Sequence, residues 1–191
     1  GNANTILFEF QANQMPDILA AHPQVSYSLE GEQQMEGEFV SGLVRGFIVA
    51  LFVIFALMAI PFKSYLQPII VMSAVPFGLV GAVIGHVVLG FTLNFMSMLG
   101  MVAVAGVVVN DSLVLVHFIN RQVSKHGSLK NAVREAGAAR FRPILLTSLT
   151  TTAGVTPLML EKSLQAQFMI PMAVALASGV LFATVVTLLL V

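Results

Sequence analysis

The residue with the most obvious chemistry is Asp111, a carboxylate inside an apolar stretch. It is the only acidic residue between Glu38 and Glu135, and residues 64–110 contain no Asp, Glu, Lys or Arg. A charged side chain at the centre of a bilayer costs about 3 kcal/mol on insertion scales, and such residues mostly mark ion pathways. A carboxyl group removed from water can bind and release a proton near neutral pH. We therefore predict that Asp111 is a proton carrier; the alternative is a permanently hydrogen-bonded Asp that joins helices.

Polar neighbours could assist this carboxylate. Asn110 precedes it, and a hydroxyl-rich patch at 147–152 places Thr147 and Thr151 on one face of a helix. Such hydroxyls can orient a carboxylate and pass protons through water, although they can also bond back to carbonyls of their own helix. Arg140 and Arg142 precede the patch. Arg140 could take part in proton transfer, and anchoring of the helix at the cytoplasmic boundary is the alternative role for both arginines. The predicted proton relay comprises Asp111, Asn110, Thr147, Ser148, Thr151 and Arg140.

Small residues predict where helices approach each other closely. Two GxxxG pairs and one further glycine on the stripe that leads to Asn110 have the spacing that lets helices pack in a membrane. The predicted packing positions are Gly42, Gly46, Gly81, Gly85 and Gly106.

The composition excludes several functions. Of the 191 residues, 57% are hydrophobic and 9% are charged, whereas soluble domains average about 25% charged residues. The formal net charge is zero, so nothing favours a nucleic-acid partner. The chain has no Cys, His86 and His117 lack a second ligand at metal spacing, and phosphate loops and nucleophile–base motifs are absent. We therefore expect no metal, no cofactor and no enzymatic activity.

The pattern of hydropathy predicts a mainly α membrane protein. Residues 1–38 are acidic and contain no Lys or Arg; 24–30 alternate like a strand, and 4–21 favour a helix. This segment is predicted to be a small α/β remnant of an external domain. A helix needs about 20 apolar residues to cross a bilayer. Five such spans are predicted in residues 39–191, at about 39–61, 67–89, 93–119, 143–160 and 168–191, with a surface helix at about 126–139 capped by Ser128.

Loop charge predicts the orientation. The loop after the third span carries six basic residues and one acid, Glu135, which assigns it to the cytoplasm. The acidic N-terminal segment then lies outside and the C-terminus inside. Because the chain starts at Gly1 and ends within an apolar helix at Val191, we expect it to be a piece of a longer protein.

Four stretches of the chain together resemble a known family. They are VSYSLEGEQQ, FALMAIPFKSYLQPIIVMSAVPFGLVGA, GVVVNDSLVLVHFINR and FRPILLTSLTTTAGVTPL. Their order resembles the C-terminal half of a resistance-nodulation-division (RND) efflux transporter, over nearly the whole chain. The resemblance implies that the spans are helices eight to twelve of twelve and that residues 1–38 end the periplasmic porter domain. It also implies an inner-membrane proton antiporter, commonly a homotrimer. Its implied partners are its own N-terminal half, a periplasmic adaptor, an outer-membrane channel and membrane lipid.

The resemblance also assigns roles to single residues. In drug-pump members this half contributes a Lys that pairs with two Asp residues of the other half, whereas here that position is Asn110, followed by Asp111. Thr147 matches the family's relay hydroxyl, and Arg140 matches its cytoplasmic-end arginine. The implied function is proton-driven export of hydrophobic or amphiphilic compounds from the periplasm or inner membrane. The alternatives are a lipid exporter or protein-translocation accessory of the same superfamily, and a non-transporting scaffold or sterol-sensing-type receptor.

Overall fold

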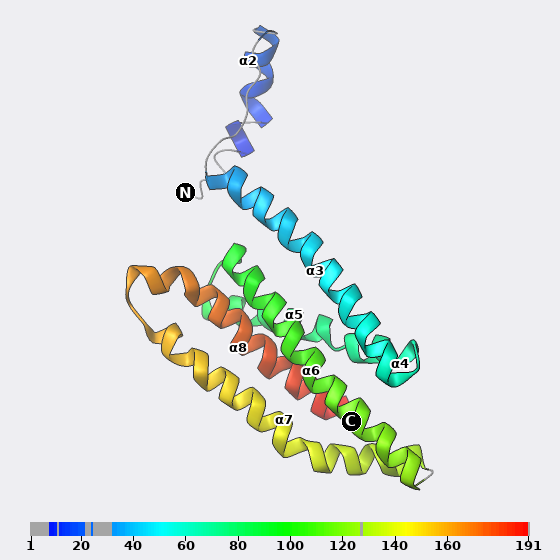
Figure 1. The fold of residues 1–191 in the computed structure, drawn as a ribbon. Helices are drawn as coiled ribbons and strands as arrows, with labels where there is room; N and C mark the ends of the chain where they lie inside the picture. Colours follow the sequence, from blue (N-terminus) through cyan, green and yellow to red (C-terminus); the bar gives the residue numbers. More distant parts are fainter. Residues whose placement is uncertain (1–7, 11, 22–23, 25–31, 127, 191) are drawn as a thin grey trace. The chain divides into compact units, whose positions relative to one another are not determined.

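The computed structural model describes residues 8–10, 12–21, 24, 32–126 and 128–190, and within them it contains helices and no strand (Figure 1). The chain divides into two compact units, Gly1–Phe39 and Val40–Val191. In the first unit, α2 covers Met15–Ala21. The strand expected at 24–30 lies, apart from residue 24, outside the described residues.

The predicted bundle of membrane-spanning helices is confirmed. Five helical stretches are long and apolar enough to cross a membrane: Gly37–Phe62, Leu66–Leu89, Phe95–Ser124, Leu129–Leu160 and Leu164–Leu189. They belong to α3 (Glu32–Phe62), α4 (Leu66–Met72), α5 (Val75–Leu89), α6 (Phe95–His126), α7 (Leu129–Leu160) and α8 (Leu164–Leu190).

The second span is broken between α4 and α5, where one helix was expected. Pro76 lies just inside the start of α5. Its ring has no N–H to donate and would clash with the carbonyl of Met72 one turn earlier, so the helix cannot run straight through. Hydrogen bonds between residues three positions apart replace the α-helical pattern at the break. Ala74 N donates to Val71 O at 3.3 Å, and Ser73 Oγ donates to Ile70 O at 2.7 Å.

At α7 the structure has one continuous helix where the sequence predicted two. A surface helix at about 126–139 and a separate span at 143–160 were expected, but one helix covers Leu129–Leu160. Pro143 lies inside it and removes one backbone hydrogen bond. Pro143 therefore does not start a new helix, and Figure 1 shows α7 bending along its length. Ser128 is the N-cap residue, although its side chain makes no capping hydrogen bond.

Helix α8 is the centre of the packing and lies against α5, α6 and α7 (Figure 1). Its buried side is built from small residues, among them Ala173, Ala175, Ala177 and Gly179. A Cβ added at Gly179 would lie 2.7 Å from Val104 of α6 and 2.9 Å from the carbonyl oxygen of Gly78 on α5. Small side chains thus bring three helix backbones close together, which replaces the hydrophobic driving force that lipid cannot supply.

The glycines expected at packing contacts separate into two groups. Gly81 and Gly85 lie against α8, where an added Cβ would collide with Phe182 and Ser178, respectively. Outside the nearby backbone of their own helix, Gly42, Gly46 and Gly106 have no atom of a described residue within 4 Å of an added Cβ, so no other described helix covers them.

Candidate functional site

Asp111 lies on α6 at the contact between α6, α7 and α8. It is partly buried and lines a cavity of about 10 Å³. The other walls are Val108 of α6, Ile144 of α7, and Val180, Ala183, Thr184 and Thr187 of α8. A cavity of this size is at the lower limit for one water molecule, and a water needs two or more polar partners. Asp111 and two threonines supply such partners.

Two hydrogen-bonded hydroxyl groups lie beside this cavity. Ser148 of α7 and Thr184 of α8 are 0% and 6% exposed, and their side-chain oxygens lie 2.5 Å apart. Ser148 Oγ also lies 3.0 Å from the carbonyl oxygen of Ile144. Ser148 has one hydroxyl hydrogen, so it donates either to Ile144 or to Thr184; in the first case Thr184 donates to Ser148. The pair therefore offers two hydrogen positions one step from the cavity of Asp111.

The structure orients the hydroxyl patch differently from the sequence-based relay. Thr147 is exposed, and its hydroxyl donates to Pro143 O at 3.0 Å on its own helix. Thr151 is partly buried. Within the predicted relay, Ser148 is the residue hydrogen-bonded to a wall of the Asp111 cavity, and Thr184 is the member that sequence reasoning missed. The signal in the sequence is weak: Thr184 and Thr187 are two of three hydroxyl residues on a mainly apolar helix, the third being Ser178.

Asn110 points away from this site. It is exposed, as are Ala103, Gly106 and His117 along the same stripe of α6. An amide facing hydrocarbon would leave its polar atoms without partners, which costs several kcal/mol per group. Small and polar residues on one side of an apolar helix are typical of a surface that another helix covers.

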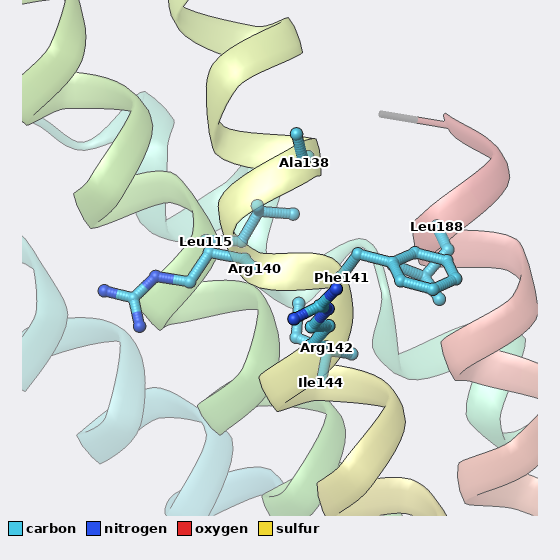
Figure 2. A pocket seen from close by; sticks show the side chains of 8 residues that line it. Leu115, Ala138, Arg140, Phe141, Arg142, Ile144 and Leu188 are labelled. Atoms are coloured by element: carbon cyan, nitrogen blue, oxygen red, sulfur yellow. The ribbon is translucent and has the colours of Figure 1, made fainter.

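Arg140 of α7 lines a second cavity, next to that of Asp111. Its guanidinium carbon is 4.8 Å from the centre of the Phe118 ring, which is a cation–π contact with α6. Its Nε atom is buried and has no hydrogen-bond partner among the described residues. Arg140 lines a cavity of about 400 Å³ that shares Ile144 with the smaller cavity of Asp111 (Figure 2). Of the predicted relay residues, Asp111 and Arg140 thus line two neighbouring cavities.

Two further polar contacts lie outside the predicted relay. His86 of α5 is 1% exposed; its Nδ1 lies 2.9 Å from Ala82 O and its Nε2 lies 2.8 Å from Ser97 Oγ on α6. Gln67 and Asn120 exchange amide hydrogen bonds at 2.7 and 3.4 Å. Both contacts satisfy polar groups inside apolar spans. Within the described residues, no group of three or more His, Cys, Asp or Glu could hold a metal ion.

Comparison with solved structures gives the same helix arrangement. Two crystal forms of a heavy metal efflux pump match with TM-scores of 0.76 and 0.72, each at 24% sequence identity. The matches cover 95% and 94% of this chain and 18% of the pump chain, so this chain spans less than a fifth of that protein. At this identity the likeness establishes the fold.

The family follows from a match over almost the entire sequence. The model of the AcrB/AcrD/AcrF family matches residues 7–191. Together with the five apolar helices, this match makes the protein a multi-pass membrane protein. The chain belongs to the AcrB/AcrD/AcrF family of RND transporters.

Proposed function

We propose that this chain is part of a proton-driven efflux transporter and that Asp111 binds and releases the coupling proton. The observation that supports this most strongly is the shared cavity: Asp111 and Thr184 line one small hollow, and Thr184 is hydrogen-bonded to buried Ser148. A carboxylate tied off inside its own helix could not act as a carrier. Asp111 has no hydrogen bond or ion pair with another described residue, and its surroundings are polar on the α8 side.

The proposed proton step uses the two hydrogen positions of the hydroxyl pair. A water molecule in the cavity exchanges a proton with Asp111, and Thr184 and Ser148 reorient to accept or donate a hydrogen bond. Protonation removes a charge from the contact of α6 with α7 and α8, which changes the relative stability of two helix arrangements. The membrane potential contributes about 2.3 kcal/mol per charge per 100 mV, in addition to the pH gradient. Thr147, Thr151 and Asn110 stay in the proposal as residues that act with the rest of the transporter.

The exposed stripe of α6 supports a protein partner for this chain. We assign that partner to the N-terminal half of the same transporter, whose acidic residues would meet Asn110 and Gly106. Such a repeat interface, with the coupling site inside the membrane, is the usual construction of secondary transporters. The family resemblance further implies a homotrimer that works with a periplasmic adaptor and an outer-membrane channel.

The proposed topology follows the basic turn between α6 and α7. Arg121 near the end of α6 and Lys130 and Arg134 near the start of α7 flank this turn and assign it to the cytoplasm by the positive-inside rule. The protein then lies in the inner membrane with its N-terminal segment in the periplasm and its C-terminus in the cytoplasm. The exported compounds are hydrophobic or amphiphilic and come from the periplasm or inner membrane, which is the activity that the resemblance implies.

The test is export by the full-length transporter reconstituted in liposomes with an imposed pH gradient. We expect Asp111→Asn and Asp111→Ala to abolish gradient-driven export while the protein stays folded, because neither side chain can carry a proton. Glu161→Gln is the matched control, since Glu161 is an exposed acid between α7 and α8. If the protein is instead a scaffold or receptor, the Asp111 substitutions should leave its activity unchanged. Normal export by both variants would therefore rule out the coupling role.

A further inference from the structure

The larger cavity beside Arg140 has a composition that the proton relay does not explain. Its volume is about 400 Å³, and it lies between α6, α7 and α8. The lining contains two cationic side chains, Arg140 and Arg142, and no acidic one. The remaining walls are apolar or small: Leu115, Phe141, Ile144 and Leu188, with Gly137 and Ala138. The cavity is therefore cationic in one part and apolar in another.

The arginines have unused hydrogen-bonding capacity. The Nε atom of Arg140 is buried without a partner among the described residues, and neither arginine forms an ion pair within this part of the chain. A buried donor left unpaired costs about 1–3 kcal/mol, and more when it is charged. Glu135, the acid nearest in sequence, accepts a hydrogen bond from Gln122 Nε2 at 2.9 Å. Two guanidinium groups thus line one cavity, and no carboxylate lies among its lining residues.

The cavity lies about one bilayer thickness from the start of α6. Leu115 is 20 residues after Phe95, at the start of α6, which is about 30 Å along a helix and matches the hydrocarbon thickness of a bilayer. Leu188 lies near the end of α8, and the lining residues of α7 follow the basic turn. Figure 2 shows Arg140 extending toward α6 while Phe141 extends toward α8 and Leu188. Charged and apolar groups therefore meet where a bilayer that begins at Phe95 would have its second layer of headgroups.

We infer that this cavity binds an anionic phospholipid of the leaflet next to the basic turn, which is the cytoplasmic leaflet in the topology proposed above. Guanidinium groups match phosphate geometry and form strong, often bidentate hydrogen bonds with it. Basic pockets between membrane helices on the cytoplasmic side are a general mode of headgroup recognition. In this site Arg140 and Arg142 hold the phosphate, and Phe141, Ile144 and Leu188 contact the first part of the acyl chain. The cavity wall Ile144 is shared with Asp111, so the lipid sits next to the coupling site.

The experiment counts bound lipid by native mass spectrometry. The intact transporter, purified in neutral detergent, is titrated with phosphatidylglycerol, with phosphatidylcholine and with inorganic phosphate. We expect phosphatidylglycerol to bind more tightly than phosphatidylcholine, and inorganic phosphate not to displace it. Arg142→Gln and Arg140→Gln each remove a charged hydrogen-bond donor and should weaken phosphatidylglycerol binding by about tenfold. The control Arg121→Gln removes an exposed charge of α6 outside the cavity and should leave binding unchanged.

Three outcomes would overturn the inference. Phosphatidylglycerol could bind the Arg142→Gln variant as tightly as the unmodified protein, or phosphatidylcholine could bind equally well. Displacement by inorganic phosphate would show a site for the free anion and not for a lipid. If Arg140→Gln does not fold, Arg142→Gln decides the question, because the Arg142 side chain is exposed. The readout is lipid retention, so a negative result leaves the proposed role of Asp111 untouched.

Discussion

The Oγ atom of Ser148 and the Oγ1 atom of Thr184 lie 2.5 Å apart where α7 meets α8. This contact joins two helices through side chains that are almost fully buried. Thr184 also lines the cavity of Asp111, so one threonine belongs to both the helix contact and the candidate site. Loss of its hydroxyl should therefore have a functional effect larger than its structural effect.

The first prediction concerns that hydroxyl. Thr184→Val keeps the branched shape and removes the oxygen, whereas Ser148 retains its bond to Ile144 O. The free energy of unfolding should fall by about 1 kcal/mol, and export driven by an imposed pH gradient should decrease clearly. The matched control is Thr150→Val, because the Thr150 hydroxyl bonds only to carbonyls of its own helix. Equal export rates for the two variants would contradict a role for Thr184 in proton movement.

A second prediction separates two GxxxG pairs that look alike in sequence. A Cβ at Gly81 would collide with Phe182 and approach the carbonyl oxygen of Ser178 to 3.1 Å. Gly81→Ala should lower stability by about 1–3 kcal/mol, the usual cost of overpacking. The added methyl group of Gly46→Ala would meet no atom of another described helix within 4 Å, so this variant should keep the stability of the unmodified protein. The midpoint of thermal unfolding in detergent measures both variants, and equal midpoints would argue against the tight α5–α8 contact.

The third prediction tests the buried histidine. Nδ1 of His86 donates to Ala82 O, which leaves Nε2 to accept from the hydroxyl of Ser97 when the imidazole is neutral. A double-mutant cycle with His86→Leu and Ser97→Ala should give a coupling energy of about 0.5–3 kcal/mol. The cycle of His117→Leu with Ser97→Ala is the control, since His117 is exposed and lies far along α6. Additive effects in the His86 cycle would mean that this hydrogen bond does not stabilise the α5–α6 contact.

The sequence predicts the helices well because the spans are long and the constraint of the bilayer is strong. A stretch of 47 residues without charge, 64–110, leaves few structures other than two crossing helices. The details at prolines were harder, because proline is compatible with both a helix start and a bend. Pro76 separates α4 from α5, whereas Pro143 lies within a continuous α7. Neighbouring packing, which one sequence does not reveal, decides between these outcomes.

The lack of packing information also explains which residues of the candidate site could be predicted from the sequence. Asp111 stands out because a lone carboxylate in an apolar run is costly wherever the helix faces. The hydroxyl patch was ambiguous, because residues 147–152 place oxygens on almost every side of a helix and adjacent residues differ by about 100°. The structure turns Ser148 toward α8 and Thr147 outward. The signal for Thr184 was weak, since a threonine in a membrane helix commonly bonds to its own backbone.

The central position of α8 has a consequence for biogenesis. This helix follows the other four spans in chain order, yet it provides the surface against which α5, α6 and α7 pack. During translation, those earlier spans enter the membrane before the helix that unites them exists. The glycine-lined and polar surfaces of these spans can therefore reach their final contacts only after α8 has been inserted.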